Sequence, residues 1–241
     1  MLISAIVGEK MPDISDLTYA ETDEEFVDVE EFSNGAIAVE MKYYLAGRKG
    51  SINKAYLRRS VAKMLVKANA LLPEGYRLKV YDAWRPYEVQ KDIFDEYLNI
   101  ISADKENAGK SYGELCKIAR TFVSFPDKTQ RFSYVHSSGG AVDLTIIDEN
   151  GEELDMGCGF DDFTELAATA ALEGTELTQE RNNRRLLYHV MSSVGFTNYP
   201  SEWWHYDYGD IFWGAITGEP VMYLSVYSAD EISPRAPSKS I

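Results

Sequence analysis

The sequence predicts an α+β fold in which helices pack against an antiparallel β-sheet. Apolar residues recur at three- and four-residue intervals in the first half of the chain, which is typical of amphipathic helices. The second half contains an alternating segment followed by a hairpin-type turn, which is typical of antiparallel strands. The 241 residues, 45% of them hydrophobic, can bury a sizeable core, and we expect one domain over residues 1–241.

The first long helix is predicted over residues 57–72, after an irregular acidic arm in residues 1–35. Asn53 is a suitable N-cap, and Pro73 and Gly75 end the helix. One apolar stripe runs along this helix: Leu57, Val61, Met64, Leu65, Ala68, Leu71 and Leu72.

A strand and two helical segments follow in the chain. Residues 76–84 are predicted to form the strand, and Pro86 opens a helix that runs to about Asn99. The stretch 105–131 is polar and mixed, and we expect helix there only near residues 113–122.

Strands dominate the second half of the chain. Residues 141–147 alternate as in a strand, the turn 149–151 reverses the chain, and residues 153–156 return beside it. The last strand candidates are residues 203–208 and 221–226.

One long helix interrupts these strands. Thr178 is expected as its N-cap and Gly195 as its C-terminal stop. Residues 233–241 are expected to form a frayed tail. The apolar stripe of this helix comprises Leu186, Leu187, Val190, Met191 and Val194.

The charge of the chain excludes some classes of partner. Its 24 Lys and Arg against 39 Asp and Glu give a net charge of -15. An acidic surface repels phosphate backbones and anionic membranes, so we expect no nucleic-acid partner. The first residues lack the basic segment of a signal peptide, and no apolar run could span a bilayer. We therefore expect a cytoplasmic protein without a membrane span.

The two cysteines, Cys116 and Cys158, cannot form a Cys-rich zinc module or a disulfide framework. We expect both to be reduced, semi-buried thiols, because a free cysteine usually packs as a small hydrophobic residue.

Two of the three histidines lie close to carboxylates in the sequence. His136 stands in a Gly-rich turn seven residues before Asp143, and the glycines let both side chains converge. His205 can add a third ligand from a distant strand. Catalytic zinc sites use three nitrogen or oxygen ligands and leave a fourth position for water. The sequence therefore predicts a zinc site at His136, Asp143 and His205.

Two further residues suit hydrolysis at such a site. Glu202 lies three residues before His205, and we expect it in the loop after Pro200, turned toward the metal as the general base. Arg85 lies between a strand end and a helix start, where a guanidinium suits an anion or a developing oxyanion. An ion pair of Arg85 with Asp82 is the alternative explanation.

Each of these residues also has a purely structural interpretation. A single histidine is usually an ordinary polar residue, and we interpret His189, within the last helix, in that way. Asp143 alone could cap a strand end. The segment 148–151 has the composition of a calcium loop but lacks its ligand spacing, so a turn is the better interpretation. The chain has neither a phosphate-binding loop motif nor a serine-hydrolase motif.

Four segments of the chain resemble the VanX-type D-alanyl-D-alanine dipeptidases. This group belongs to the zinc peptidases that also include D,D-carboxypeptidases and the hedgehog signalling fold. The resemblance runs from about Ala55 to Gly214. The matching segments are Asp82-Ala-Trp-Arg-Pro86, His136-x2-Gly-x-Ala-Val-Asp143, Met156-Gly-x2-Phe-Asp161 and Glu202-x-Trp-His205.

The resemblance implies the family's antiparallel sheet with packed helices and a role for each matching residue. His136, Asp143 and His205 would bind zinc, and Glu202 would be the general acid and base. Arg85 would stabilise the oxyanion, and Asp161 would hold the free ammonium of a small dipeptide such as D-Ala-D-Ala. Tyr134 and Val135 stand where these dipeptidases usually carry a Ser-Ser pair before the first histidine.

Two other functions remain open on the sequence alone. The first is a D,D- or L,D-carboxypeptidase or endopeptidase that uses the same residues on peptidoglycan peptides. The second is a non-catalytic, zinc-stabilised binding domain, in which Glu202 would only orient a ligand. Such a domain has no need of Arg85 and Glu202 together, so their presence favours an enzyme.

Overall fold

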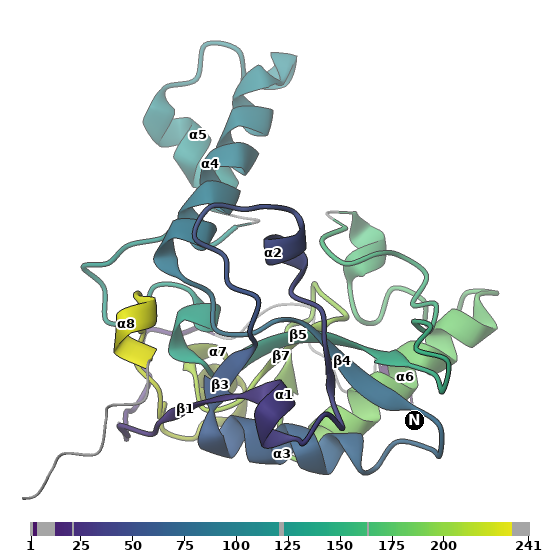
Figure 1. Cartoon of the computed structure of the whole chain (residues 1–241). Coiled ribbons are helices and arrows are strands. Elements are labelled where there is room, and N and C mark those ends of the chain that lie inside the picture. The colour runs from purple at the N-terminus through teal and green to yellow at the C-terminus, as the bar shows by residue number, and fades with distance from the viewer. Residues whose placement is uncertain (1, 4–12, 21, 121–122, 163, 233–241) are drawn as a thin grey trace, which may run out of the picture.

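A computed structural model describes residues 2–3, 13–20, 22–120, 123–162 and 164–232 of the chain. A five-stranded sheet lies at its centre, and β5 is the middle strand (Figure 1). All neighbouring strands are antiparallel except the edge pair β2 and β4, which is parallel. The strand order is β2 (Ala38–Val39), β4 (Arg77–Asp82), β5 (Ala141–Ile147), β7 (His205–Asp207) and β6 (Thr197–Asn198).

The predicted α+β fold class is confirmed, with two corrections to the sheet. The prediction of an antiparallel sheet is wrong at the edge where β2 joins β4 in parallel. A second, two-stranded antiparallel sheet also exists, formed by β1 (Phe26–Asp28) and β3 (Tyr56–Arg58).

Two long helices, α3 (Arg59–Asn69) and α6 (Thr178–Ser193), cover one face of the sheet (Figure 1). Val142, Leu144 and Ile146 of β5 belong to the core that these helices bury. Because side chains alternate along a strand, Asp143 points to the opposite face. The core thus fixes β5 from one side while its other side carries polar groups.

A helical hairpin of α4 (Tyr87–Ala103) and α5 (Tyr112–Ala119) projects from the body of the molecule (Figure 1). The two helices bury an apolar cluster of their own that includes Phe94, Leu98 and Ala119. The helix predicted from Pro86 to Asn99 is confirmed and extends to Ala103. The helix predicted near 113–122 is α5, although residues 121–122 lie outside the described part.

The remaining elements are short. They are α1 (Val29–Phe32), α2 (Lys42–Leu45), α7 (Ile211–Thr217), α8 (Ala229–Ile232) and the 3₁₀ turns η2 (Lys105–Asn107), η3 (Val135–Ser138) and η4 (Glu165–Ala167).

The prediction of an irregular arm is wrong for residues 26–32, and the first helix starts later than predicted. Residues 26–28 pair with β3, and the Asp28 carboxylate caps α1. This pairing draws residues 56–58 into a strand, so Arg58, not Asn53, is the N-cap of α3. Local propensity could not show this, because the strand that pairs with residues 56–58 lies in a distant part of the sequence.

Three predictions in the second half need correction. Leu177, not Thr178, is the N-cap of α6. Residues 153–156 form only one bridge, between Glu153 and Ile147. Residues 221–226 form no regular strand, because their N–H groups bond to carbonyls of separate segments, including those of Thr18 and Gly209. The tail 233–241 lies outside the described residues.

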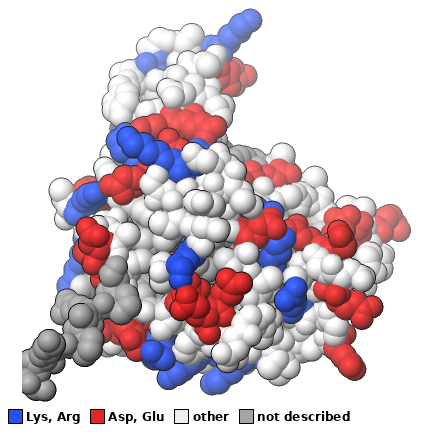
Figure 2. Space-filling model, in the orientation of Figure 1, with Lys and Arg blue, Asp and Glu red and all other residues white. Residues whose placement is uncertain are grey.

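The surface and the thiols agree with the sequence analysis. Figure 2 shows acidic side chains over much of one face, interspersed with Lys and Arg. Cys116 is buried, Cys158 is half-buried, and both are free thiols as predicted. Within the described ranges, no helix has the length and apolarity needed to cross a bilayer.

Candidate active site

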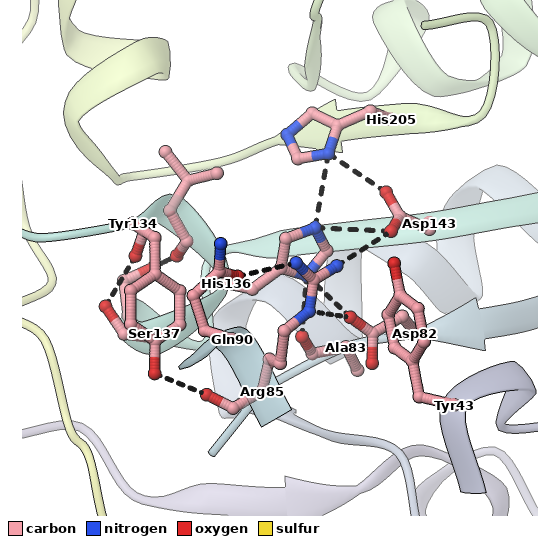
Figure 3. A network of polar contacts seen from close by, with 12 residues as sticks. Tyr43, Asp82, Ala83, Arg85, Gln90, Tyr134, His136, Ser137, Asp143 and His205 are labelled. Atoms are coloured by element: carbon pink, nitrogen blue, oxygen red, sulfur yellow. Dashed lines mark hydrogen bonds and ion pairs between the residues drawn. The ribbon is translucent and has the colours of Figure 1, made fainter. Parts of the chain in front are cut away.

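Three buried side chains converge on one point above the sheet: those of His136, Asp143 and His205 (Figure 3). One ligand atom from each lies within 4.8 Å of the others. The Nδ1 atom of His205 is 2.9 Å from Oδ1 of Asp143, and Nε2 of His136 is 3.3 Å from Oδ2 of the same carboxylate. The sequence predicted this set, and the fold brings all three residues together.

Strand pairing places two of the three groups. Asp143 of β5 and His205 of β7 are direct partners across the antiparallel pair. Directly opposite residues project to the same face with their Cβ atoms about 4.5–5.5 Å apart. The two candidate ligands are therefore adjacent because of the sheet register, although 62 positions separate them in the sequence.

The third candidate ligand, His136, lies in η3, just before β5. Gly139 ends this turn with a φ of +74°, a left-handed conformation that disfavours other residues. A Cβ on Gly139 would also overlap the Phe26 ring. The glycine therefore lets the chain reverse between His136 and β5, as the sequence analysis expected.

The outward nitrogen of each histidine is fixed by a hydrogen bond. Nδ1 of His136 is 2.7 Å from the carbonyl oxygen of Ala83, and Nε2 of His205 is 2.8 Å from Oδ1 of Asp207. A carbonyl or carboxylate accepts only from N–H, so the lone pairs of His136 Nε2 and His205 Nδ1 face each other and Asp143. Second partners of this kind typically orient metal-binding histidines. The donor set of two imidazoles and one carboxylate fits a catalytic zinc ion.

The electrostatics of the group also suit a cation. Burial opposes the charge of Asp143, but the adjacent His136 and His205 outweigh it and hold the pKa of its carboxyl below the usual range. Asp143 is therefore ionised at neutral pH and available as a ligand.

Glu202 lies in the turn before β7, as the sequence predicted. Its Oε2 atom is 4.0 Å from Nδ1 of His205, and its side chain is 31% exposed, so the carboxylate is next to the ligands and within reach of water. The enclosed position and the nearby Asp143 raise the pKa of Glu202 to about 7, against the opposing effect of His205. A carboxylate with a pKa near neutrality is suited to exchanging protons.

Arg85 is buried beside the three ligands (Figure 3). Its Nε donates to Asp82 at 2.7 Å, one terminal nitrogen donates to Gln90 at 2.7 Å, and the other lies 3.5 Å from Asp143. Burial acts to lower the pKa of Arg85, but Tyr43 and the two carboxylates outweigh it and raise the pKa. The ion pair of Arg85 with Asp82 is therefore present. It orients the permanently charged guanidinium toward the site.

Asp161 enters the site from the loop between β5 and α6. It has a φ of +58°, and its carboxylate accepts a hydrogen bond from the Tyr43 hydroxyl at 3.2 Å. Burial raises the pKa of Asp161 to about 6. Asp161 and Glu202 both line the pocket that contains the three converging groups.

One pocket gathers every site residue that the sequence predicted. It is lined by Arg85, His136, Asp143, Asp161, Glu202 and His205. His189, which we interpreted as an ordinary polar residue, lies on α6 and does not line this pocket.

Several contributors escaped the sequence analysis. Tyr43, Gln90 and Tyr199 also line the pocket, and Asp207 supports His205 from behind. Of these residues, only Asp207 could have been found from the sequence. It follows His205 by two residues, and residues at this spacing lie on the same face of a strand. Tyr43 comes from α2, where no local pattern marks it.

A buried His-Asp-His group with an adjacent carboxylate and guanidinium is the arrangement of a metal-dependent hydrolase. The model of the peptidase M15 family, described as D-Ala-D-Ala dipeptidase, matches residues 23–217. The chain therefore belongs to this family, and the family resemblance inferred from the sequence is confirmed.

Several similar proteins are named D-alanyl-D-alanine dipeptidases. A D-alanyl-D-alanine dipeptidase of Synechocystis is 28% identical over 178 residues, which cover 65% of this chain and 70% of that protein. The corresponding Escherichia coli K12 enzyme is 31% identical over 133 residues, 55% of each chain. The Enterococcus faecium enzyme is 30% identical over 164 residues, 64% of this chain and 74% of that one.

Solved structures with a detectable likeness include two of the vancomycin-resistance D,D-pentapeptidase VanY. One is a complex with Zn(II), with a TM-score of 0.44, and it covers 88% of this chain and 94% of that one. The other, VanYB with D-alanine-D-alanine, has a TM-score of 0.45 and covers 88% and 93%. Both are 17% identical to this chain.

Proposed function

We propose that this protein is a zinc-dependent dipeptidase that hydrolyses D-alanyl-D-alanine or a similar free dipeptide. The observation that carries the proposal is the convergence of His136 Nε2, the Asp143 carboxylate and His205 Nδ1 in a pocket that also contains Glu202. Three relatives with about 30% identity are named D-alanyl-D-alanine dipeptidases, which supports this substrate.

His136, Asp143 and His205 would hold the zinc ion. When bound, zinc polarises a carbonyl and lowers the pKa of water toward about 7. Glu202 takes a proton from the attacking water, and its raised pKa lets it return that proton to the leaving amine. The C–O bond forms first, and the C–N bond breaks when the leaving nitrogen receives the proton, so one water molecule and one dipeptide give two amino acids.

Arg85 would stabilise the negative charge that develops on the scissile carbonyl oxygen. Its guanidinium is held in place by Asp82 and Gln90 and lies at the wall of the pocket beside Asp143. A fixed donor of this kind needs no reorganisation during the reaction, and removing one typically costs about 2.7–4 kcal/mol of barrier.

Asp161 would bind the free ammonium group of the substrate, and the Tyr43 hydroxyl would orient it. A carboxylate in this enclosed position is best compensated by a cation, which a free N-terminus supplies. This role accounts for a preference for dipeptides over chains that continue on the N-terminal side.

The proposal is tested by hydrolysis of D-Ala-D-Ala, L-Ala-L-Ala, N-acetyl-D-Ala-D-Ala and a longer peptide ending in D-Ala-D-Ala, with and without added zinc. We expect zinc-dependent cleavage of the free D,D-dipeptide, much slower cleavage of the acetylated one, and none by Glu202→Ala, which should still bind zinc. If only longer D-Ala-D-Ala peptides were cleaved, the enzyme would be a carboxypeptidase. Zinc binding without any cleavage would indicate a binding domain.

The cytoplasmic location expected from the sequence also stays a proposal. The acidic surface and the two free thiols support it. Fractionation of the native host, with detection of the untagged protein, would test it.

A further inference from the structure

Glu202 has a carboxylate whose position is not fixed by its own hydrogen bonds. In the part of the chain that the structure describes, no group donates a hydrogen bond to this carboxylate, and its ion-pair contact is with His205 at 4.0 Å. A catalytic group must nevertheless be held close to its productive place. The backbone of its turn, residues 199–204, must therefore supply the positioning.

One buried side chain closes that turn. Asn198, at the end of β6, is 7% exposed, and its Nδ2 donates to the carbonyl of Glu202 at 3.1 Å and to that of His205 at 2.9 Å. The backbone of the turn supplies longer bonds: the Tyr199 N–H donates to His205 at 3.2 Å, and the direct bond from His205 to Glu202 is 3.4 Å long. Asn198 therefore adds two side-chain hydrogen bonds that tie Glu202 and His205 to the end of β6.

The other end of the same amide is anchored as well. Oδ1 of Asn198 accepts from the hydroxyl of Thr169 at 2.7 Å, and Thr169 is 2% exposed. The N–H of Thr169 donates to Pro200 at 2.9 Å, and that of Trp203 donates to Ala167 at 2.9 Å. Hydrogen bonds with Asn198 and with residues 167–169 therefore hold the turn at several points.

We propose that Asn198 is a positioning residue that holds Glu202 at a fixed place beside His205. The inference rests on the proposed role of Glu202 as the base. Asn198 does not line the pocket and so acts through the turn, not on the substrate. Asp207 orients the His205 ring independently, so loss of the Asn198 donors should displace Glu202 much more than the metal ligand.

The central test is Asn198→Asp, which keeps the size of the side chain and the acceptor for Thr169 but replaces both donors with a carboxylate oxygen that repels the two carbonyls. We expect kcat for D-Ala-D-Ala to fall about 10–100-fold, the range typical of residues that orient active-site groups. KM and the zinc affinity, measured by chelator competition, should stay close to their wild-type values. Thr169→Val keeps the Asn198 donors and should lower kcat less than Asn198→Asp does.

Asn150→Asp is the matched control, because Asn150 lies in an exposed turn outside the pocket. An unchanged kcat in Asn198→Asp would overturn the inference. A fall in zinc affinity as large as the fall in kcat would also overturn it, since Asn198 would then act on His205.

A crystal structure of zinc-loaded Asn198→Asp tests the inference without activity. The carboxylate of Glu202 should move while His205 keeps its place, and an unmoved Glu202 would contradict the proposal. If wild-type protein failed to cleave any dipeptide, the proposed function would fail, and this structural comparison would still decide the role of Asn198.

Discussion

Asp207 holds His205 from the side opposite the pocket, with its Oδ1 2.8 Å from Nε2 of the ring. The pair fixes the tautomer that leaves Nδ1 free to bind a metal. Asp207 is fully buried, so no water can replace it in this role.

We therefore predict that Asp207→Asn weakens zinc binding about 10–100-fold, because a neutral amide makes His205 a poorer ligand. Competition with a chelator measures the affinity. Asp155→Asn, at an exposed carboxylate, is the control and should bind zinc like the wild type. Equal affinities of the two variants would show that Asp207 has no role in metal binding.

Arg85→Lys should lower kcat about 100–1,000-fold, with a smaller effect on KM. Lysine has a single ammonium group and cannot bond Asp82 and Gln90 while also pointing at the pocket. Steady-state kinetics with zinc-saturated enzyme measures the effect. Arg48→Lys, at an arginine paired with Asp92 outside the pocket, should retain wild-type kcat. A kcat near that of the wild type in Arg85→Lys would exclude the oxyanion role.

The pH dependence of kcat/KM should report Asp161. Its pKa is about 6 because of burial, so the carboxylate is ionised above pH 6 and becomes neutral as the pH falls through that value. Binding of the substrate ammonium therefore weakens on the acidic side, and kcat/KM falls. In Asp161→Asn, kcat/KM should be lower at neutral pH, and it should fall less steeply as the pH is lowered. If the fall at acidic pH were unchanged, other groups, such as Glu202, would be its cause.

Asp210 should tolerate replacement by asparagine. Burial and the nearby Asp207 raise the pKa of Asp210 well above its usual value, which favours the protonated form of its carboxyl. Asp207 and Asp210 each have one buried carboxylate oxygen that no donor in the described part of the chain reaches. One proton shared by these two oxygens satisfies both of them. The side-chain amide of an asparagine at this position can donate in the same way.

Asp210→Asn should therefore stay within about 1 kcal/mol of wild-type stability, whereas Asp210→Ala should lose about 1–3 kcal/mol. The alanine variant also removes the acceptor for the N–H groups of Phe212 and Trp213 at the start of α7. Urea unfolding measures both variants. If the asparagine variant were as unstable as the alanine variant, Asp210 would be ionised.

Gly139→Ala should destabilise the protein by about 1–3 kcal/mol from backbone strain, the typical cost of a residue held in a strained conformation, and by more if the Phe26 contact adds to it. The φ of +74° and the Phe26 ring both oppose a Cβ. Thermal unfolding measures the loss. Gly35→Ala is a suitable comparison, because it has a similar φ but no atom within 4 Å of the added Cβ. Equal losses would show that the contact with Phe26 adds nothing.

The sequence predicted much of the site because the chemistry is concentrated in short segments. His136 and Asp143 belong to one turn and strand, and Glu202 and His205 to another. No single structural role would account for two histidines and two carboxylates at these positions. A metal site was therefore the simplest explanation for all four residues. The contribution of Tyr43 could not be predicted, because it depends on how α2 packs near the sheet.

The long helices α3, α4 and α6 and the central strand β5 were also predictable, because each has a clear apolar periodicity. The pairs β1–β3 and β2–β4 were not. Each involves only two or three residues per strand, and such short segments gain their structure from a distant partner rather than from their own sequence.

The position of Asp143 in the middle strand has a consequence for folding itself. A slip of β5 by one residue would turn Asp143 into the apolar core and send Val142 or Leu144 to the polar face. Burying an unpaired carboxylate costs several kcal/mol, so a pairing shifted by one residue is strongly disfavoured. The carboxylate that we propose as a metal ligand therefore also disfavours misalignment of the central strand by one residue.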